Sequence, residues 1–327
     1  GMLGMHGNVG PNRKTNECDV LIAIGMRFDD RVTGDLKTYA KQAKIIHLDI
    51  DNSEIGKNVP VDVKVLGNAK HTIPMITALL EERKRPEWNA EFEPDEKEEY
   101  NKVIEKELYP TEGQLKMGEV VRKVSEATDN DAILVTDVGQ NQMMGVRYFK
   151  YKQTRSVVTS GGLGTMGFGL PAAMGAKFGA PDRTVCFFTG DGGMQMNIQE
   201  FATAMCQETN IIVCVLNNYY LGMVRQIQQL FYGKRYEATC LKRRKACPPR
   251  CKGPGEDCPP YEPDFVKLAE SYGASGKRIE KEEEILPALQ WAREQQTPVV
   301  LEFMIATEEI VLPMVKSGNP MSEMILK

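Results

Sequence analysis

Five short apolar segments, separated mostly by stretches with a helical pattern, constrain the fold of this chain more than any other feature. They cover residues 132–136, 155–159, 184–189, 211–216 and 298–304. Each is apolar nearly throughout, as expected for strands buried on both faces. Strands that alternate with helices favour a parallel sheet with helices on both faces. We therefore predict an α/β fold for residues 113–327.

The first part of the chain shows a smaller version of the same pattern. Residues 19–24 and 44–50 are β-branched runs, which we expect to form two short parallel strands. Residues 69–85 have apolar positions at helical spacing and end before Pro86. The acidic stretch 86–112 is expected to be a solvated linker with one helix. The predicted units are therefore residues 1–85, the charged linker 86–112, and residues 113–327.

Charge and hydropathy exclude several classes of function. The 327 residues include 41 Lys and Arg against 45 Asp and Glu, a formal net charge of −4. This balance argues against a nucleic-acid partner. No apolar run is long enough to cross a bilayer, and the first residues do not resemble a secretory signal. We expect a cytoplasmic protein without a membrane partner.

Polar residues follow two neighbouring strands at their carboxyl ends, where parallel sheets bind ligands. Asp191 lies in the sequence Gly190-Asp191-Gly192-Gly193, and Asn218 follows the next strand 27 residues later. Carboxylate and amide oxygens suit Mg²⁺, and flanking glycines allow a diphosphate to approach the backbone. A helix expected to begin near residues 194–198 would point its N–H groups at the anion. These residues predict a magnesium and diphosphate site.

A second glycine motif leaves another interpretation open. Residues 162–167 form a GxGxxG pattern after a predicted strand and before a predicted helix. Such a motif occurs in nicotinamide dinucleotide sites, and Asp191 stands near the position of the acidic residue that binds the ribose. The glycines around Asp191 fit phosphate and metal better than a ribose hydroxyl. The magnesium and diphosphate interpretation is therefore preferred over a nicotinamide oxidoreductase.

Motifs along nearly the whole chain resemble the catalytic subunit of acetohydroxyacid synthase (acetolactate synthase), a thiamine diphosphate enzyme. The motifs are Gly4-Met-His-Gly7, Arg27-Phe-Asp-Asp-Arg31, Asp137-Val-Gly-Gln140, residues 159–171, Gly190-Asp-Gly, Asn217-Asn218, Leu221-Gly-Met-Val224 and Leu312-Pro-Met-Val315. The resemblance implies a diphosphate-binding domain after a truncated, Rossmann-like, FAD-binding middle domain. The family's pyrimidine-binding domain has no counterpart in this sequence. Its catalytic glutamate is therefore missing too, so no catalytic residue is assigned here.

The resemblance also implies a role for individual residues. Mg²⁺ would be bound by Asp191, Asn218 and the backbone carbonyl of Tyr220. Thiamine diphosphate would contact one set of residues, and a structural FAD would contact another. The thiamine diphosphate set is Gln140, Asn141, Gly164, Met166, Gly192, Gly193 and Met223, and the FAD set is Met5, His6, Gly25, Arg27, Asp29, Arg31 and Asp49.

The implied reaction joins two 2-oxo acids with loss of carbon dioxide, in branched-chain amino-acid biosynthesis. Pyruvate would yield 2-acetolactate, and 2-oxobutyrate would be the alternative second substrate. The expected assembly is a homo-oligomer, with a small regulatory subunit as a further partner. Without the pyrimidine-binding domain, the chain is expected to be inactive alone. A non-catalytic or split-enzyme binding module and another thiamine diphosphate enzyme, a decarboxylase or oxidase, remain alternatives.

Three positions depart from the family pattern. Asn141 stands where the family usually has histidine beside the diphosphate, so we expect at most modestly weaker binding. Asn68 replaces an acidic residue near the FAD adenosine, which puts flavin affinity in doubt. Ile227 replaces a tryptophan that favours 2-oxobutyrate. Ile227 is therefore predicted to give poor selection of 2-oxobutyrate over pyruvate.

An insertion at residues 237–262 contains four cysteines with the spacing C-x6-C-x3-C-x6-C. Zinc or an iron–sulfur cluster, disulfides, and a loop carrying unmodified thiols are the three interpretations. The spacing lacks the paired C-x2-C motifs of many zinc sites. It therefore favours a loop with thiols. The residues are Cys240, Cys247, Cys251 and Cys258.

Overall fold

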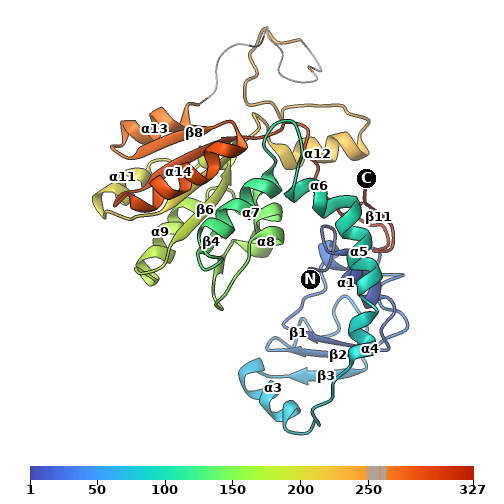
Figure 1. The fold of residues 1–327 in the computed structure, drawn as a ribbon. Coiled ribbons are helices and arrows are strands. Elements are labelled where there is room, and N and C mark those ends of the chain that lie inside the picture. Colours follow the sequence, from blue (N-terminus) through green and yellow to red (C-terminus); the bar gives the residue numbers. More distant parts are fainter. Residues whose placement is uncertain (249–250, 252–257, 259–262) are drawn as a thin grey trace. The chain divides into compact units, whose positions relative to one another are not determined.

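The computed structural model describes residues 1–248, 251, 258 and 263–327, and the chain divides into two compact units. Unit 1 comprises Gly1–Lys106 and Leu312–Lys327, and unit 2 comprises Glu107–Val311. Each unit contains its own parallel sheet (Figure 1). The described part of the chain has no helix that is both long and apolar enough to cross a membrane.

The sheet of unit 2 has six parallel strands in the order β5-β4-β6-β7-β9-β8. All five strands predicted for this region are present, and the α/β prediction is confirmed. An additional strand, β8, was missed because it lies at the edge of the sheet and is mostly polar or small in sequence. The strands are β4 (Ile133–Thr136), β5 (Val157–Val158), β6 (Val185–Gly190), β7 (Ile212–Asn217), β8 (Ser275–Ile279) and β9 (Val299–Met304).

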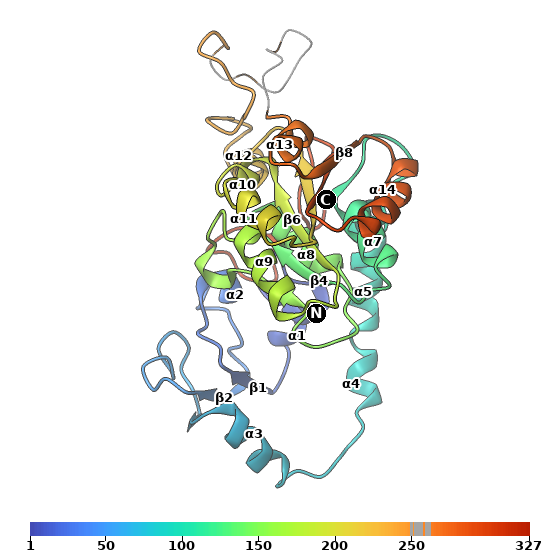
Figure 2. The same cartoon turned by 90° about the vertical axis from the view of Figure 1, so that its left-hand side faces the viewer.

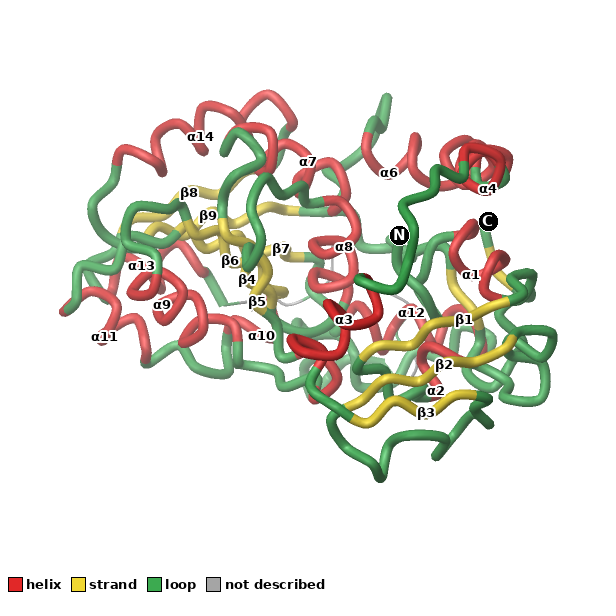
Figure 3. Tube along the Cα trace, turned by 90° about the horizontal axis from the view of Figure 1, so that it is seen from below, coloured by secondary structure: helices red, strands yellow, loops and turns green. Residues whose placement is uncertain are grey.

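Helices cover both faces of this sheet (Figure 3). One face carries α7 (Met117–Ala127), α8 (Gln140–Tyr148) and α14 (Glu282–Glu294), and the other carries α9 (Gly169–Gly179), α11 (Glu200–Cys206) and α13 (Phe265–Ser271). A core between the sheet and the second group of helices includes the buried side chains of Phe187, Phe201, Val213 and Phe265. Burial on both faces explains why the central strands are apolar throughout.

Two further helices, α10 (Asp191–Met194) and α12 (Gly222–Phe231), lie at the same end of the sheet of unit 2 (Figure 2). They follow the carboxyl ends of β6 and β7. The prediction that a helix begins near residues 194–198 was wrong, since α10 begins at Asp191 and the next helix, α11, begins at Glu200. Gly192 and Gly193 form part of this short, closely packed helical turn.

Unit 1 is built on a three-stranded parallel sheet, β1-β2-β3. The two predicted strands are present, while β3 is an additional edge strand. A small core on this sheet contains Phe28, Tyr39 and Ile45. The elements are α1 (Val9–Thr15), β1 (Val20–Ile24), α2 (Asp30–Thr33), β2 (Lys44–Asp49), β3 (Val63–Leu66), α3 (Ala69–Thr77), β10 (Met314–Val315) and β11 (Met324–Ile325).

The helix predicted over residues 69–85 is shorter than expected, because α3 ends at Thr77. Its apolar side chains are exposed, and Leu79 beyond its end is 87% exposed. Helices of this length depend on packing of an apolar face, and Pro74 also removes one backbone donor. The sequence pattern is helical, but the exposed apolar side chains provide too little packing to stabilise a longer helix.

Residues 86–108 also differ from the expected solvated linker with one helix. They form α4 (Pro86–Ala90), α5 (Glu93–Glu99), a π-helical turn η1 (Tyr100–Ile104) and α6 (Glu105–Leu108). The carboxylate of Glu99 is buried and accepts hydrogen bonds from Val9 N–H at 2.7 Å and Asn8 Nδ2 at 2.8 Å. Much of this acidic stretch therefore packs within unit 1.

The C-terminal residues group with unit 1, although the sequence suggested that residues 113–327 form one unit. The backbone N–H of Val315 donates to the carbonyl of Met5 at 2.8 Å. The backbone N–H of Asp35 donates to the carbonyl of Asn319 at 3.0 Å. These hydrogen bonds join segments far apart in sequence, which a linear reading of the chain does not reveal.

Candidate functional site

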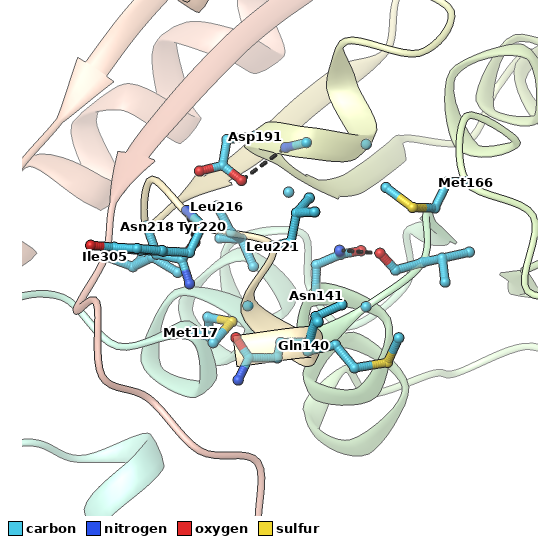
Figure 4. A pocket seen from close by; sticks show the side chains of 18 residues that line it. Met117, Gln140, Asn141, Met166, Asp191, Leu216, Asn218, Tyr220, Leu221 and Ile305 are labelled. Atoms are coloured by element: carbon cyan, nitrogen blue, oxygen red, sulfur yellow. Dashed lines mark hydrogen bonds between the residues drawn. The ribbon is translucent and has the colours of Figure 1, made fainter. Parts of the chain in front are cut away.

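The carboxyl ends of β4, β6 and β7 meet at a cavity of about 90 Å³ in unit 2. Figure 4 shows that side chains from these three chain segments, together with Met166, surround it. Gly164 and Ile227 are not among the residues that line the cavity. The predicted residues that do line it are Gln140, Asn141, Met166, Asp191, Gly192, Gly193, Asn218, Tyr220 and Met223.

Three helices begin at this cavity. Residues at the N-termini of α8, α10 and α12 all line it, and none of these helices has a side-chain cap at its N-terminus. The first N–H groups of a helix have no partner within that helix, and they carry a partial positive charge. Three such ends around one cavity make it suitable for an anion with several oxygens, such as a diphosphate.

Asp191 is the buried carboxylate of the cavity, with an exposed fraction of 4%. Its Oδ1 accepts a hydrogen bond from Gly192 N–H at 2.8 Å, whereas its Oδ2 is buried without a hydrogen-bond partner in the described structure. Burial raises the pKa of Asp191 to about 7, and the backbone N–H groups of Gly192 and residues 218–220 oppose this rise. The carboxylate therefore lies beside the loop after β7.

The two asparagines at the end of β7 have different surroundings. Asn217 Nδ2 donates to the buried Glu302 carboxylate at 2.8 Å, so its side chain belongs to the core of unit 2. Asn218 instead lines the cavity, and its Oδ1 accepts the N–H of Tyr220 at 3.0 Å. That oxygen has a second lone pair. Asn218 is therefore the amide suited to a ligand in the cavity.

Glycines allow the backbones around the cavity to approach one another. A Cβ atom at Gly192 would lie 2.6 Å from Leu221 Cδ2, and one at Gly193 would lie 2.7 Å from Asp137 Oδ1. A Cβ atom at Gly222 would lie 2.1 Å from Gln140 Oε1. A larger residue at these positions would displace a neighbour.

Gln140 and Asn141 reach the cavity in different ways. The Nε2 of Gln140 donates to the carbonyl of Glu309 and to Gln226 Oε1, each at 2.9 Å. Its side-chain donors are therefore used, and its backbone at the start of α8 is the part available to an anion. Asn141 Nδ2 donates to the carbonyl of Val138 at 3.1 Å, while its Oδ1 is buried and without a hydrogen-bond partner in the described part of the chain.

Backbone N–H groups at the end of the glycine motif 162–167, and just after it, donate hydrogen bonds to a protein carboxylate. Asp137 Oδ2 accepts the backbone N–H groups of Gly167 at 3.0 Å and Gly169 at 3.1 Å, at the beginning of α9. In a nicotinamide site, N–H groups at this place would be needed by the pyrophosphate. The geometry therefore disfavours the nicotinamide interpretation. Asp137 belongs to the motif at residues 137–140, but its local sequence carries no sign of this hydrogen-bonding role.

The seven residues predicted to contact FAD all lie in unit 1. Gly25 and Asp49 are at the carboxyl ends of the paired strands β1 and β2. Asp29 caps α2 by accepting the N–H of Arg31, and Arg27 Nε lies 3.4 Å from Asp29 Oδ2. The remaining two, Met5 and His6, are held by hydrogen bonds from Met5 N–H to the carbonyl of Arg31 and between His6 Nδ1 and the carbonyl of Pro313.

A parallel α/β domain that gathers a carboxylate, an amide and three helix N-termini at one cavity is suited to a metal ion bound with a diphosphate. The chain belongs to the thiamine pyrophosphate enzymes. Residues 137–303 match the family described as "Thiamine pyrophosphate enzyme, C-terminal TPP binding domain". Residues 1–76 match "Thiamine pyrophosphate enzyme, central domain".

Within these enzymes, the chain is similar to proteins named as acetolactate synthase large subunits. It is 42% identical to a probable acetolactate synthase large subunit of Methanocaldococcus jannaschii over 330 residues, which cover 99% of this chain and 52% of the relative. It is 39% identical to the acetolactate synthase large subunit of Haemophilus influenzae over 328 residues, covering 100% and 54%. The chain thus spans about half the length of the curated relatives it matches.

Proposed function

We propose that this chain provides the metal and diphosphate half-site of an acetolactate synthase large subunit. The observation that carries the proposal is the buried Asp191 Oδ2, which lacks a protein partner in the described structure and lies beside the loop at residues 218–220. A buried carboxylate oxygen of this kind is suited to a cation. Asp191, Asn218 and the carbonyl of Tyr220 would hold Mg²⁺, which favours oxygen ligands and phosphate.

The N-termini of α8 and α10 would bind the diphosphate through backbone N–H groups of Gln140 and Gly193, with Gly192 and Asn141 beside them. Met166 and Met223 line the same cavity and would contact the aminopyrimidine ring. Gly164, with a left-handed φ of 58°, would present its backbone nearby. Bound thiamine diphosphate supplies the carbanion chemistry, while these residues position it and exclude water.

The proposed reaction is the condensation of two molecules of pyruvate to 2-acetolactate with decarboxylation, in branched-chain amino-acid biosynthesis. 2-Oxobutyrate is the proposed alternative second substrate. Ile227, a half-buried residue of α12, would select poorly for it. Because the chain spans about half the length of the curated relatives it matches, we propose that it does not turn over pyruvate alone. A reducing, cytoplasmic setting is proposed because eight cysteines in 327 residues are too few for a disulfide scaffold.

FAD is the proposed structural cofactor of unit 1. Arg27 and Arg31 have side chains that are 61% and 62% exposed, near the carboxyl end of β1, and can reach a dinucleotide phosphate. Asn68 is the N-cap of α3 and accepts the N–H of Lys70 at 2.9 Å. Because this cap uses the Asn68 oxygen, we propose weak flavin binding.

A second polypeptide surface is proposed to cover the cavity side of unit 2. Leu163, Met196 and Val224 are exposed, and Val224 lines the cavity itself. Exposed apolar groups beside a binding site support contact with another protein surface. A homo-oligomer, with a small regulatory subunit as a further partner, is the proposed assembly.

The proposal is tested by titrating the purified chain with thiamine diphosphate in a calorimeter, with and without Mg²⁺. We expect binding that requires Mg²⁺ and that Asp191→Asn weakens at least tenfold. The matched control is Asp182→Asn, since Asp182 is exposed on unit 2. Circular dichroism spectra of both variants verify that they are folded.

The assay for 2-acetolactate from pyruvate addresses the reaction separately. We expect no product from the chain alone, and product after addition of a protein that contains the other half of an acetolactate synthase large subunit. Binding without product in the mixture would favour a non-catalytic module. Absence of Mg²⁺-dependent binding in the folded wild-type chain would refute the proposed half-site.

A further inference from the structure

The four cysteines of the insertion line one cavity of unit 2. This second cavity, of about 20 Å³, is bounded by Cys240, Cys247, Cys251 and Cys258, together with basic and aromatic residues. The other four cysteines of the chain do not line it. Only these four thiols, which span 19 residues of the sequence, therefore face the same small space.

This cysteine cavity is connected to the loop that carries the candidate magnesium ligands. Tyr220 and Cys240 form an antiparallel bridge, with hydrogen bonds of 2.9 Å from Leu221 N–H to the carbonyl of Thr239 and from Leu241 N–H to the carbonyl of Tyr219. Tyr220 lines both cavities. Burial raises the pKa of the Tyr220 phenol, and the nearby thiols of Cys240 and Cys251 act in the same direction.

The chemistry of the cavity suits a thiophilic cation. Four thiolates around one divalent ion give a net charge of −2, which the flanking Lys242 and Arg243 can offset. The backbone N–H of Arg244 donates to Cys247 Sγ at 3.2 Å, a contact that stabilises a thiolate. Cys247 and Cys251 are separated by three residues, within the range common for paired zinc ligands.

We propose that Cys240, Cys247, Cys251 and Cys258 bind one structural zinc ion. Four thiolates are the complete ligand set of one tetrahedral zinc ion. As they stand, the described residues contain no group of three or more His, Cys, Asp or Glu side chains arranged to hold a metal. We therefore expect zinc binding to bring the four thiolates together, since metal binding commonly couples to the arrangement of its ligands.

The proposed ion would hold Cys240 in place within unit 2. It would thereby also stabilise the backbone bridge between Cys240 and Tyr220. Its role is structural, because four protein thiolates complete a tetrahedral zinc site and leave no position for a substrate. Zinc binding by the four cysteines does not depend on the proposed reaction. It differs in ligand chemistry from the magnesium site, which is built from oxygen atoms.

The test is elemental analysis of the intact chain, purified from cells supplied with zinc and dialysed without chelator. We expect about one zinc per chain and little iron. Cys247→Ser, and separately Cys251→Ser, should lower the zinc content at least fivefold. Cys206→Ser is the matched control, since Cys206 is an exposed cysteine of α11 and should leave the zinc content unchanged.

Cobalt substitution provides a second measurement that does not depend on the stability of any variant. Replacement of zinc by Co²⁺ should give the visible absorption of a tetrahedral cobalt thiolate, and excess zinc should remove it. Iron with acid-labile sulfide, absence of metal with all thiols reactive, or full zinc content in the Cys247→Ser and Cys251→Ser variants would overturn the proposal. Thiamine diphosphate titration of the same samples reports on the magnesium half-site independently.

Discussion

Gln140 and Gln226 meet through their side chains, with Gln140 Nε2 donating to Gln226 Oε1 at 2.9 Å. Both residues are buried, and they come from the beginning of α8 and from α12. Gln226 Oε1 also accepts the backbone N–H of Val311 at 2.7 Å. One amide oxygen thus links two helices that begin at the cavity to the segment that follows β9.

Replacement of Gln226 by leucine should therefore destabilise the protein and weaken thiamine diphosphate binding. Two buried donors would lose their acceptor, which costs about 1–3 kcal/mol of unfolding free energy for an unsatisfied buried group. Gln226→Glu keeps an acceptor oxygen and should restore most of the binding. Gln207→Leu, on an exposed glutamine of unit 2, is the control. Denaturant titration measures the unfolding free energy, and calorimetry measures thiamine diphosphate binding. Equal unfolding free energies and equal affinities for Gln226→Leu and the control would contradict the prediction.

Two glycine substitutions in unit 2 should have opposite effects. Gly193→Ala should destabilise the chain, because the new Cβ atom would lie 2.7 Å from Asp137 Oδ1 and 2.9 Å from Thr189 Oγ1. Gly175→Ala places a methyl group in open space within α9 and should stabilise the helix by about 1 kcal/mol at most. Thermal melts of both variants test the pair. A melting temperature for Gly193→Ala at or above the wild-type value would contradict the prediction. It would show that the backbone of α10 adjusts to accommodate the methyl group.

The sequence predicted the central architecture because burial leaves a clear pattern. β6 and β7 are buried on both faces and therefore apolar along nearly their whole length. β8 lacked this signal, since edge strands expose polar residues such as Lys277 and Arg278. The grouping of residues 312–327 with unit 1 rests on contacts between distant segments, for which the local sequence has no signature.

The candidate site was predictable only in part, for a related reason. Asp191 and Asn218 follow adjacent parallel strands, and parallel topology brings such positions to one edge. The network of Gln140, Gln226 and the carbonyl of Glu309 could not be predicted in the same way. It depends on side-chain directions and on an irregular segment after β9, neither of which follows from spacing.

Asp137 should contribute strongly to stability through the first turn of α9. Its carboxylate is buried and accepts the N–H groups of Val138, Gly167 and Gly169. Asp137→Asn would place a donor where one acceptor stands, so we expect a loss of about 1–3 kcal/mol in unfolding free energy. Denaturant unfolding beside Asp182→Asn, the exposed control, measures the difference. An unchanged denaturation midpoint for Asp137→Asn would contradict the prediction and show that another group accepts the N–H groups at the start of α9.

Glu309 should make stability fall as the pH rises from about 5 to 8. Burial raises its pKa from 4.5 to about 8, and both of its carboxyl oxygens accept the N–H of Met117, at 3.2 and 3.0 Å. Between these two pKa values the folded chain binds a proton that the unfolded chain releases. The unfolding free energy therefore falls by up to about 1.4 kcal/mol per pH unit from this group.

Glu309→Gln retains an acceptor for Met117 without a titrating proton, so its stability should depend less on pH over the same interval. The pKa of Asp191 is also raised, so Asp191 makes the unfolding free energy fall with pH in the same direction. This contribution is the same in the wild-type and Glu309→Gln proteins and cancels when their pH profiles are compared. Carboxylates with lowered pKa values, such as Glu282, lose their contribution only in more acidic solution. Denaturant unfolding of both proteins at several pH values, with chelator present, measures the difference. Parallel pH profiles would show that Glu309 is ionised in the folded chain throughout this range.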